Sequence, residues 1–169
     1  MIYTIAAIPT TYKGILFRSR LEATWAAFFD LCGWEWKYEP CDFNKWLPDF
    51  RITTSVCNVY AEVKPIDLDQ VWRDIQTGKP LPMSYGKATN NSGEVPVILL
   101  GNAPMSRDGI GLVVMERGRA HIIAGSTLEE IDRSLHTKNA ATKWREADNI
   151  VMGIPPSNRK HSIFSGVWD

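Results

Sequence analysis

The sequence predicts a mixed α/β (α+β) fold, in which helices flank one β-sheet. Three observations lead to this prediction: a capped amphipathic helix over residues 20–32, three short extended segments between 34 and 63, and an apolar run over 95–100. The chain has 169 residues, a length that fits one domain. We therefore expect a single domain over 1–169, with its core at about 17–101.

The helix over 20–32 has clear signals at both ends. Ser19 is a favoured N-cap residue, and Glu22 follows three positions later, which is the spacing of a capping box. Gly33 is a natural C-terminal stop. Between these ends, apolar residues recur at helical spacing and form one face: Leu21, Trp25, Phe28, Phe29 and Cys32.

Three extended segments follow this helix. Residues 34–39 alternate between aromatic and charged side chains, a pattern typical of a half-buried strand, and Pro40 ends it. Segments 47–53 and 58–63 are the next two predicted strands. Pro65 ends the last of them, because proline cannot donate a hydrogen bond to a β-ladder.

The next stretch alternates between helix and strand signals. Asp67 can cap a helix that runs to about Gln76. Residues 84–94 are polar and rich in glycine and asparagine, so we expect a loop there. The apolar run at 95–100 predicts a strand buried on both faces, near the centre of the sheet.

The C-terminal part, 102–169, is predicted to hold a hairpin and two helices and has no motif that indicates a function. Segments 112–116 and 120–124 are extended and are joined by a short turn containing Gly118. Thr127 and Glu130 form a second capping box, which begins a helix to about Leu135. A further helix is expected over 140–151.

Composition and charge exclude several classes of protein. Lys plus Arg and Asp plus Glu both number 19, so a strongly basic protein that coats nucleic acid is excluded, and any such binding needs a local basic face. The 3 cysteines form no CxxC pair, which favours a reducing, cytoplasmic location. No stretch approaches the roughly 18 apolar residues of a membrane span.

The residues that indicate chemistry lie on the second and third predicted strands. Asp49 opens one strand, and Glu62 and Lys64 lie on one face of the next, because side chains alternate along a strand. If the two strands pair, Asp49 comes close to Glu62. Two carboxylates beside an ammonium group suit Mg²⁺-dependent cleavage of a phosphodiester, since Mg²⁺ prefers oxygen ligands and polarises phosphoryl oxygens.

This stretch resembles the PD-(D/E)XK nuclease superfamily, which has the restriction-endonuclease-like fold. Pro48-Asp49 is similar to its PD, and Glu62-Val63-Lys64 is similar to its (D/E)XK. Glu22, in an S-x-L-E helix start, is similar to the glutamate that many members add from the first core helix. The layout is similar to the phage and bacterial branch, including the end-cutting nuclease subunit of Tn7-like transposons and the junction resolvases.

The resemblance implies a mixed sheet with an αβββαβ core and a site for Mg²⁺ or Mn²⁺. It implies that Asp49, Glu62 and the main-chain carbonyl of Val63 bind the metal, that Lys64 is the catalytic lysine, and that Glu22 binds or orients a metal-bound water. It also implies DNA as the partner, with a homodimer or a larger DNA-processing assembly.

Each of these residues also has a purely structural interpretation. Glu22 can serve as the N3 residue of the capping box. Asp49 can be a turn residue after proline, and Glu62 with Lys64 can be an ion pair on a solvated strand face. Basic residues that could contact DNA phosphates lie near the helix start and in the C-terminal part: Arg18, Arg20, Lys143 and Arg145.

The sequence therefore predicts a metal-dependent DNA endonuclease, either structure-specific or acting at DNA ends. Two alternatives stay open. One is a catalytically silent DNA-binding or assembly protein with the same fold. The other is a protein-binding inhibitor or scaffold whose motif match is accidental, for which the 7 tryptophans could supply an interface.

Overall fold

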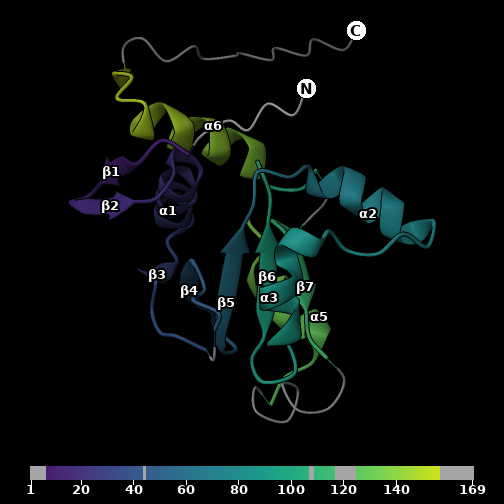
Figure 1. Ribbon diagram of the computed structural model, residues 1–169. Coiled ribbons are helices and arrows are strands. Elements are labelled where there is room, and N and C mark those ends of the chain that lie inside the picture. Colours follow the sequence, from purple (N-terminus) through teal and green to yellow (C-terminus); the bar gives the residue numbers. More distant parts are fainter. Residues whose placement is uncertain (1–6, 44, 107–108, 117–124, 157–169) are drawn as a thin grey trace, which may run out of the picture.

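A five-stranded mixed sheet forms the centre of the molecule in the computed structural model (Figure 1), which describes residues 7–43, 45–106, 109–116 and 125–156. Its strands lie in the order β3-β4-β5-β6-β7. Only β5 and β6 pair in parallel, and the other neighbours are antiparallel. The strands are β3 (Glu35–Tyr38), β4 (Phe50–Thr53), β5 (Asn58–Val63), β6 (Val97–Leu100) and β7 (Leu112–Val114).

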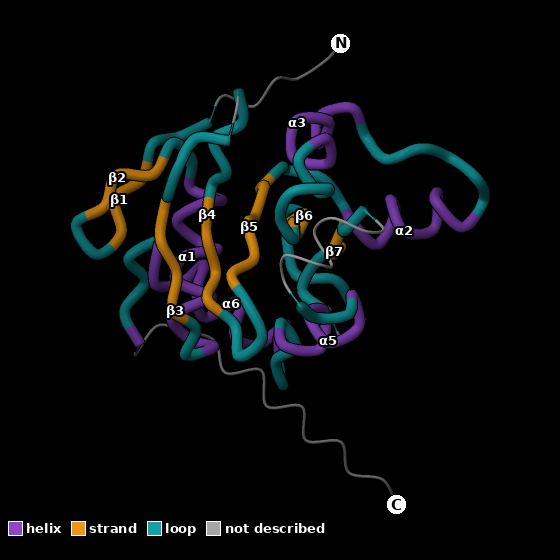
Figure 2. The backbone as a smooth tube through the Cα atoms, turned by 90° about the horizontal axis from the view of Figure 1, so that it is seen from below, coloured by secondary structure: helices purple, strands orange, loops and turns teal. Residues whose placement is uncertain are grey.

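Helices cover both faces of this sheet, as the mixed α/β prediction requires (Figures 1 and 2). One hydrophobic core joins the sheet to α1 and α6, and a second joins it to α2 and α3. Among the described residues, no helix is both long and apolar enough to cross a membrane. The helices are α1 (Arg20–Cys32), α2 (Leu68–Gln76), the 3₁₀ turn η1 (Met83–Tyr85), α3 (Gly86–Asn90), α5 (Leu128–Ser134) and α6 (Ala140–Val151).

The alternation of side chains along β5 assigns its two faces to the two cores. Val59, Ala61 and Val63 pack in the core under α1, whereas Tyr60 packs against the core on the α2 and α3 side. Glu62 therefore points to the same face as Tyr60, toward α3. This face assignment determines which segments can reach the predicted site.

Most of the predicted elements are confirmed. From α1 to β6 the order is α1, β3, β4, β5, α2, η1, α3 and β6, so η1 and α3 are added to the αβββαβ order that the resemblance implies. The structure also contains an element that the sequence did not predict, and one local prediction is wrong. The N-terminal stretch contains a hairpin of β1 (Thr10–Tyr12) and β2 (Ile15–Phe17), whose turn places Lys13 and Gly14 at positive φ. The predicted loop at 84–94 contains α3. The predicted second strand at 120–124 and its turn lie outside the described residues.

Trp25 ties three elements together at the centre of the larger core. It is 0% exposed, and its ring lies 4.6 Å from the ring of Trp144 on α6, measured between centroids. Its indole N–H donates to the carbonyl of Gly101, just after β6, over 2.9 Å. One side chain on α1 therefore contacts α6 and the end of a central strand.

We expect Trp25→Ala to lower the free energy of unfolding by about 3–5 kcal/mol, because it leaves a cavity and an unpaired carbonyl. Urea unfolding followed by circular dichroism measures the loss. Trp72→Ala is the matched control, because Trp72 is 39% exposed and should cost much less. Equal losses for the two variants would contradict this account of the core.

Candidate active site

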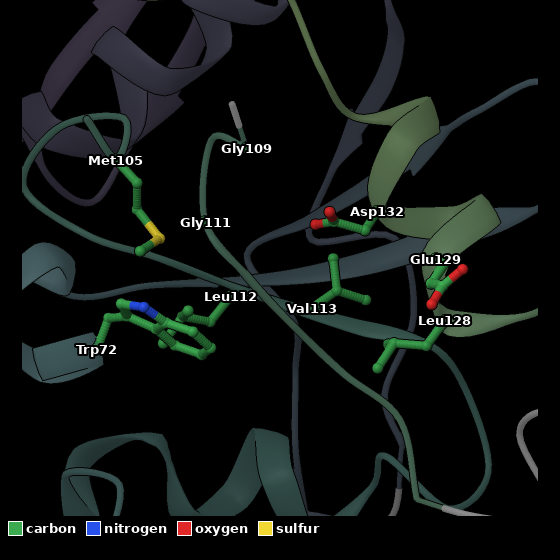
Figure 3. A pocket seen from close by; sticks show the side chains of 9 residues that line it. All are labelled: Trp72, Met105, Gly109, Gly111, Leu112, Val113, Leu128, Glu129 and Asp132. Carbon is green, nitrogen blue, oxygen red and sulfur yellow. The ribbon is translucent and has the colours of Figure 1, made fainter. Parts of the chain in front are cut away.

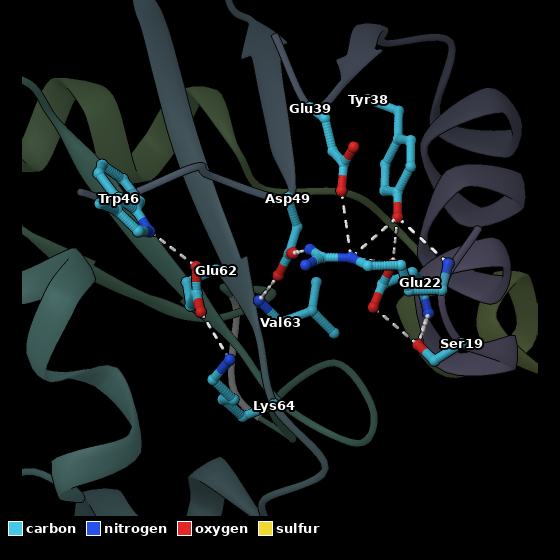
Figure 4. A network of polar contacts seen from close by, with 10 residues as sticks. Ser19, Glu22, Tyr38, Glu39, Trp46, Asp49, Glu62, Val63 and Lys64 are labelled. Atoms are coloured by element: carbon cyan, nitrogen blue, oxygen red, sulfur yellow. Dashed lines mark hydrogen bonds and ion pairs between the residues drawn. The ribbon is translucent and has the colours of Figure 1, made fainter. Parts of the chain in front are cut away.

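The predicted catalytic residues line one polar pocket of about 580 Å³. It lies where β4 begins, β5 ends and α1 begins, and Figure 4 shows the contacts among its side chains. The structure thus brings together residues that the sequence separates by more than forty positions. The pocket is lined by Arg18, Glu22, Lys45, Trp46, Leu47, Asp49, Glu62, Val63, Lys64, Met83, Ser84 and Lys87.

Asp49 is held by both its main chain and its carboxylate. Its N–H donates to the carbonyl of Ala61 and its carbonyl accepts from the N–H of Glu39, each over 2.9 Å. Its Oδ2 accepts from the N–H of Val63 over 2.7 Å, and its Oδ1 accepts from Arg18 over 2.5 Å. With 3% of its surface exposed, Asp49 is a buried carboxylate, not a solvated turn residue.

Glu62 and Lys64 form an ion pair on the α3 side of β5. The Lys64 Nζ lies 2.6 Å from Glu62 Oε1. The other oxygen, Oε2, accepts the indole N–H of Trp46 over 2.8 Å. Glu62 is 8% exposed, so the interpretation of this pair as a solvated strand face does not hold.

Glu22 faces the pocket from the first turn of α1. The hydroxyl of Ser19 accepts from the N–H of Glu22, which confirms Ser19 as the N-cap, but the second bond of the predicted capping box, from the Ser19 N–H to the Glu22 carboxylate, is not formed. The carboxylate itself accepts from the Ser19 hydroxyl over 3.0 Å and from the Tyr38 hydroxyl over 2.6 Å. Glu22 therefore takes part in capping through its main chain while its buried carboxylate lines the pocket.

Arg18 bridges the acidic groups from the solvent side of the pocket. Its guanidinium contacts Asp49, as described above, and its Nε lies 3.1 Å from a carboxylate oxygen of Glu39. Burial acts to lower the pKa of Arg18, but the Tyr38 hydroxyl and the charge of Asp49 outweigh it, so the pKa is raised. Arg18 therefore stays charged and offsets part of the acidic cluster.

Burial, together with repulsion from a neighbouring carboxylate, raises the pKa of Asp49 from 3.8 to about 7. Burial contributes most, and the neighbouring charge of Glu62 adds to it. The N–H of Val63 and the guanidinium of Arg18 act in the opposite direction without cancelling the effect. An oxygen-binding cation placed between Asp49 and Glu62 would relieve this repulsion.

The pocket offers carboxylate oxygens, the type of donor that Mg²⁺ and Mn²⁺ prefer. As the side chains lie, no group of three or more Asp, Glu, His or Cys among the described residues is arranged to hold a metal ion. Each carboxylate is engaged by a protein donor, Asp49 by Arg18 and Glu62 by Lys64. Mg²⁺ is commonly bound by only one or two carboxylates, with water and substrate phosphate as its other ligands.

The other predicted phosphate contacts lie away from this pocket. Arg20 directs its guanidinium toward the sulfur of Met152, at 3.3 Å. Lys143 and Arg145 are on α6, which packs against α1, and the Lys143 ammonium donates to the Thr137 hydroxyl. Of the four basic residues singled out in the sequence, Arg18 alone lines the pocket.

Sequence reasoning missed several residues of the site. From the sequence alone, Trp46 could either pack in the core or line a groove; it is 2% exposed, and its indole N–H also donates to Glu62. Its position three residues before Asp49 was the available signal. Lys45 and Lys87 also line the pocket. Lys87 could not be found, because the segment that carries it was predicted to be a loop.

A second pocket, of about 360 Å³, lies between α2, β7 and α5 (Figure 3). Its lining is largely apolar, with Trp72 on one side and Leu128 on the other. Its acidic residues are Glu129 and Asp132, and Asp132 pairs with His136 at 3.2 Å. None of the predicted catalytic residues lines this pocket.

Comparison with known proteins found no matching family model, no similar curated protein and no similar solved structure.

The raised pKa of Asp49 predicts how stability depends on pH. Between about 4 and about 7 the folded state binds a proton that the unfolded state has released. The free energy of unfolding should therefore fall as the pH rises through this range. Asp49→Asn lacks the titration and keeps an oxygen that can accept from Val63, so its stability should fall less.

Urea unfolding of both proteins across this pH range, in EDTA, measures the difference. Parallel pH profiles for the wild type and Asp49→Asn would show that Asp49 titrates normally.

Proposed function

We propose that this protein is a metal-dependent DNA endonuclease with a restriction-endonuclease-like fold. The observation that carries the proposal is the convergence of Asp49, Glu62 and Lys64 on one polar pocket, with both carboxylates buried. Buried carboxylates that repel each other are costly to a fold, so their presence in an accessible pocket favours a functional role.

In the proposed hydrolysis, each residue of the pocket has a distinct role. Asp49 and Glu62 would hold the metal ion, with the Val63 carbonyl as a further oxygen and Glu22 orienting a water molecule. When bound, Mg²⁺ or Mn²⁺ would polarise the phosphoryl group and lower the pKa of a water. Lys64, freed from Glu62, would orient the attacking water and offset the negative charge that develops on the phosphate oxygens.

The proposal predicts metal-dependent cleavage that requires Lys64. The pure protein is incubated with labelled single-stranded, duplex, flapped and four-way DNA, in Mg²⁺, Mn²⁺ or EDTA. Cleavage should occur in Mg²⁺ or Mn²⁺ and not in EDTA. Lys64→Ala should slow it by about 100-fold or more, since a positioned proton-transfer or charge-stabilising group contributes on that order.

Lys37→Ala is the matched control, because Lys37 is an exposed lysine on β3 and does not line the pocket. Cleavage that survives in Lys64→Ala would point to a contaminating nuclease. DNA binding with no cleavage in either metal would favour the catalytically silent alternative.

Trp46 should act as a positioning residue for Glu62. Trp46→Phe keeps a ring beside Phe43, whose centroid lies 5.8 Å away, but removes the indole N–H that Glu62 accepts. We expect Mn²⁺ to bind this variant several-fold more weakly, because a buried carboxylate that loses a donor is free to turn away. Titration calorimetry measures the affinity, and unchanged Mn²⁺ binding would mean that Trp46 only fills the core.

A further inference from the structure

Two short segments meet at the mouth of the pocket, and each presents a lysine and an apolar side chain. Lys45 and Leu47 come from the turn before β4, and Met83 and Lys87 come from η1 and α3. We call these four residues the pocket rim. All four line the same pocket as the predicted catalytic residues, although the two segments lie far apart in the sequence.

The turn that carries Lys45 is fixed from both sides. Phe43 and Trp46 form an isolated bridge with two main-chain hydrogen bonds, of 2.7 and 2.9 Å. Lys45 has a φ of 80°, a conformation that residues with a side chain rarely adopt. Such strain persists where the surroundings hold it, and it gathers at functional sites. Here the buried Trp46 holds the turn, so Lys45 stays at the mouth of the pocket.

The segment that carries Met83 and Lys87 is anchored from below. Tyr85 and Ala88 are both 0% exposed and belong to the second core. The Tyr85 hydroxyl donates to the carbonyl of Leu100 on β6 over 2.8 Å, and Figure 1 shows α3 against β6. Because the inward side chains are fixed, the outward ones, Met83 and Lys87, have a defined position over the pocket.

The two rim lysines differ from the other cations of the pocket. Arg18 and Lys64 are engaged by Asp49 and Glu62. Within the part of the chain that the structure describes, neither Lys45 nor Lys87 has a carboxylate within ion-pair distance, and both are exposed. Their charges are therefore available to an anionic ligand that lies across the mouth.

The apolar side chains of the rim indicate that the ligand also has apolar surfaces. Met83 is 96% exposed, the largest value for a large hydrophobic side chain among the described residues, and Leu47 is 40% exposed. One exposed apolar side chain is ordinary. Two of them beside two lysines, over the pocket that we propose cleaves phosphodiesters, match a ligand with alternating phosphates and flat apolar faces. Methionine and leucine are side chains that proteins insert against unstacked bases.

We propose that the pocket rim binds a nucleic-acid strand that has an unstacked base next to the pocket. Lys45 and Lys87 contact its phosphates, and Leu47 and Met83 pack against the exposed base. The substrate class is thus DNA with a single-stranded, flapped or frayed segment at the cleavage point, rather than uninterrupted duplex. This inference rests on the proposed function for its choice of ligand, but it concerns binding and can be tested without cleavage.

The test measures binding in EDTA, by fluorescence anisotropy of a flapped DNA and of the matching duplex, over a series of salt concentrations. The wild type should bind the flapped DNA at least tenfold more tightly. Lys45→Ala and Lys87→Ala should each reduce the slope of log K against log salt by about 1, because each removes one phosphate contact. Lys37→Ala, the same change on β3, should leave the slope unchanged.

The apolar residues are tested by the preference between the two DNAs. Met83→Ser should reduce the preference for flapped DNA several-fold, since it removes the apolar surface that Met83 would bury against the base. Leu16→Ser is its control, because Leu16 is 66% exposed on β2 and does not line the pocket. Folding of each variant is checked by its thermal unfolding, which these exposed positions should not shift.

The proposal requires both results. It is overturned if the lysine variants keep the wild-type salt slope, if Met83→Ser keeps the wild-type preference, or if the slope falls with Lys143→Ala and Arg145→Ala on α6 instead. Cleavage assays separate this inference from the proposed function. If DNA binding depends on the rim residues but no cleavage occurs, the proposed nuclease function is refuted and the binding role of the rim stands. If cleavage occurs and no rim variant changes it, the binding role of the rim is refuted and the nuclease function stands.

Discussion

The carboxylate of Asp49 sits at the point where three strands meet, and the rest of the pocket depends on where it is held. Its main-chain N–H is bonded to β5 and its main-chain carbonyl to the residue after β3, so only its side chain is left to meet the N–H of Val63. That bond fixes the end of β5 against the start of β4. Because side chains alternate along the chain, fixing Val63 also directs its two sequence neighbours, Glu62 and Lys64, to the opposite face from Val63, where they pair with each other.

This arrangement has a cost that the surroundings offset only in part. Arg18 and the N–H of Val63 stabilise the charge of Asp49, yet burial and the nearby Glu62 still raise its pKa. The negative charges of the pocket also act on the second core, where burial and the charges of Glu62 and Asp49 raise the pKa of Tyr85. A fold selected only for stability would replace these carboxylates by apolar residues of similar size. Repulsion between buried carboxylates is what the proposed cation would relieve on binding.

The sequence predicts those parts of the fold and site whose signals are local. The capped helix at 20–32 and the alternation over 58–63 are visible within a few residues, so Glu22, Glu62 and Lys64 could be placed on their elements. That Lys87 lines the same pocket as Trp46 could not be predicted, because it depends on which segments cover each face of β5. Lys87 reaches the pocket through the bond of Tyr85 to Leu100, a tertiary contact that no pattern in 84–94 encodes.

The zero formal charge of the chain is compatible with a polyanionic ligand once the positions of the charges are considered. The pocket interior holds the carboxylates of Glu22, Asp49 and Glu62, which repel an approaching phosphate. Lys45 and Lys87 stand at its mouth, and Arg18 and Lys64 lie against the carboxylates themselves. At physiological salt, charges act over roughly 8 Å, so a phosphate at the mouth interacts with the rim lysines more strongly than with the chain as a whole. A metal ion that took over the carboxylates would release Arg18 and Lys64 as well, and the pocket would then change from locally balanced to attractive for phosphate.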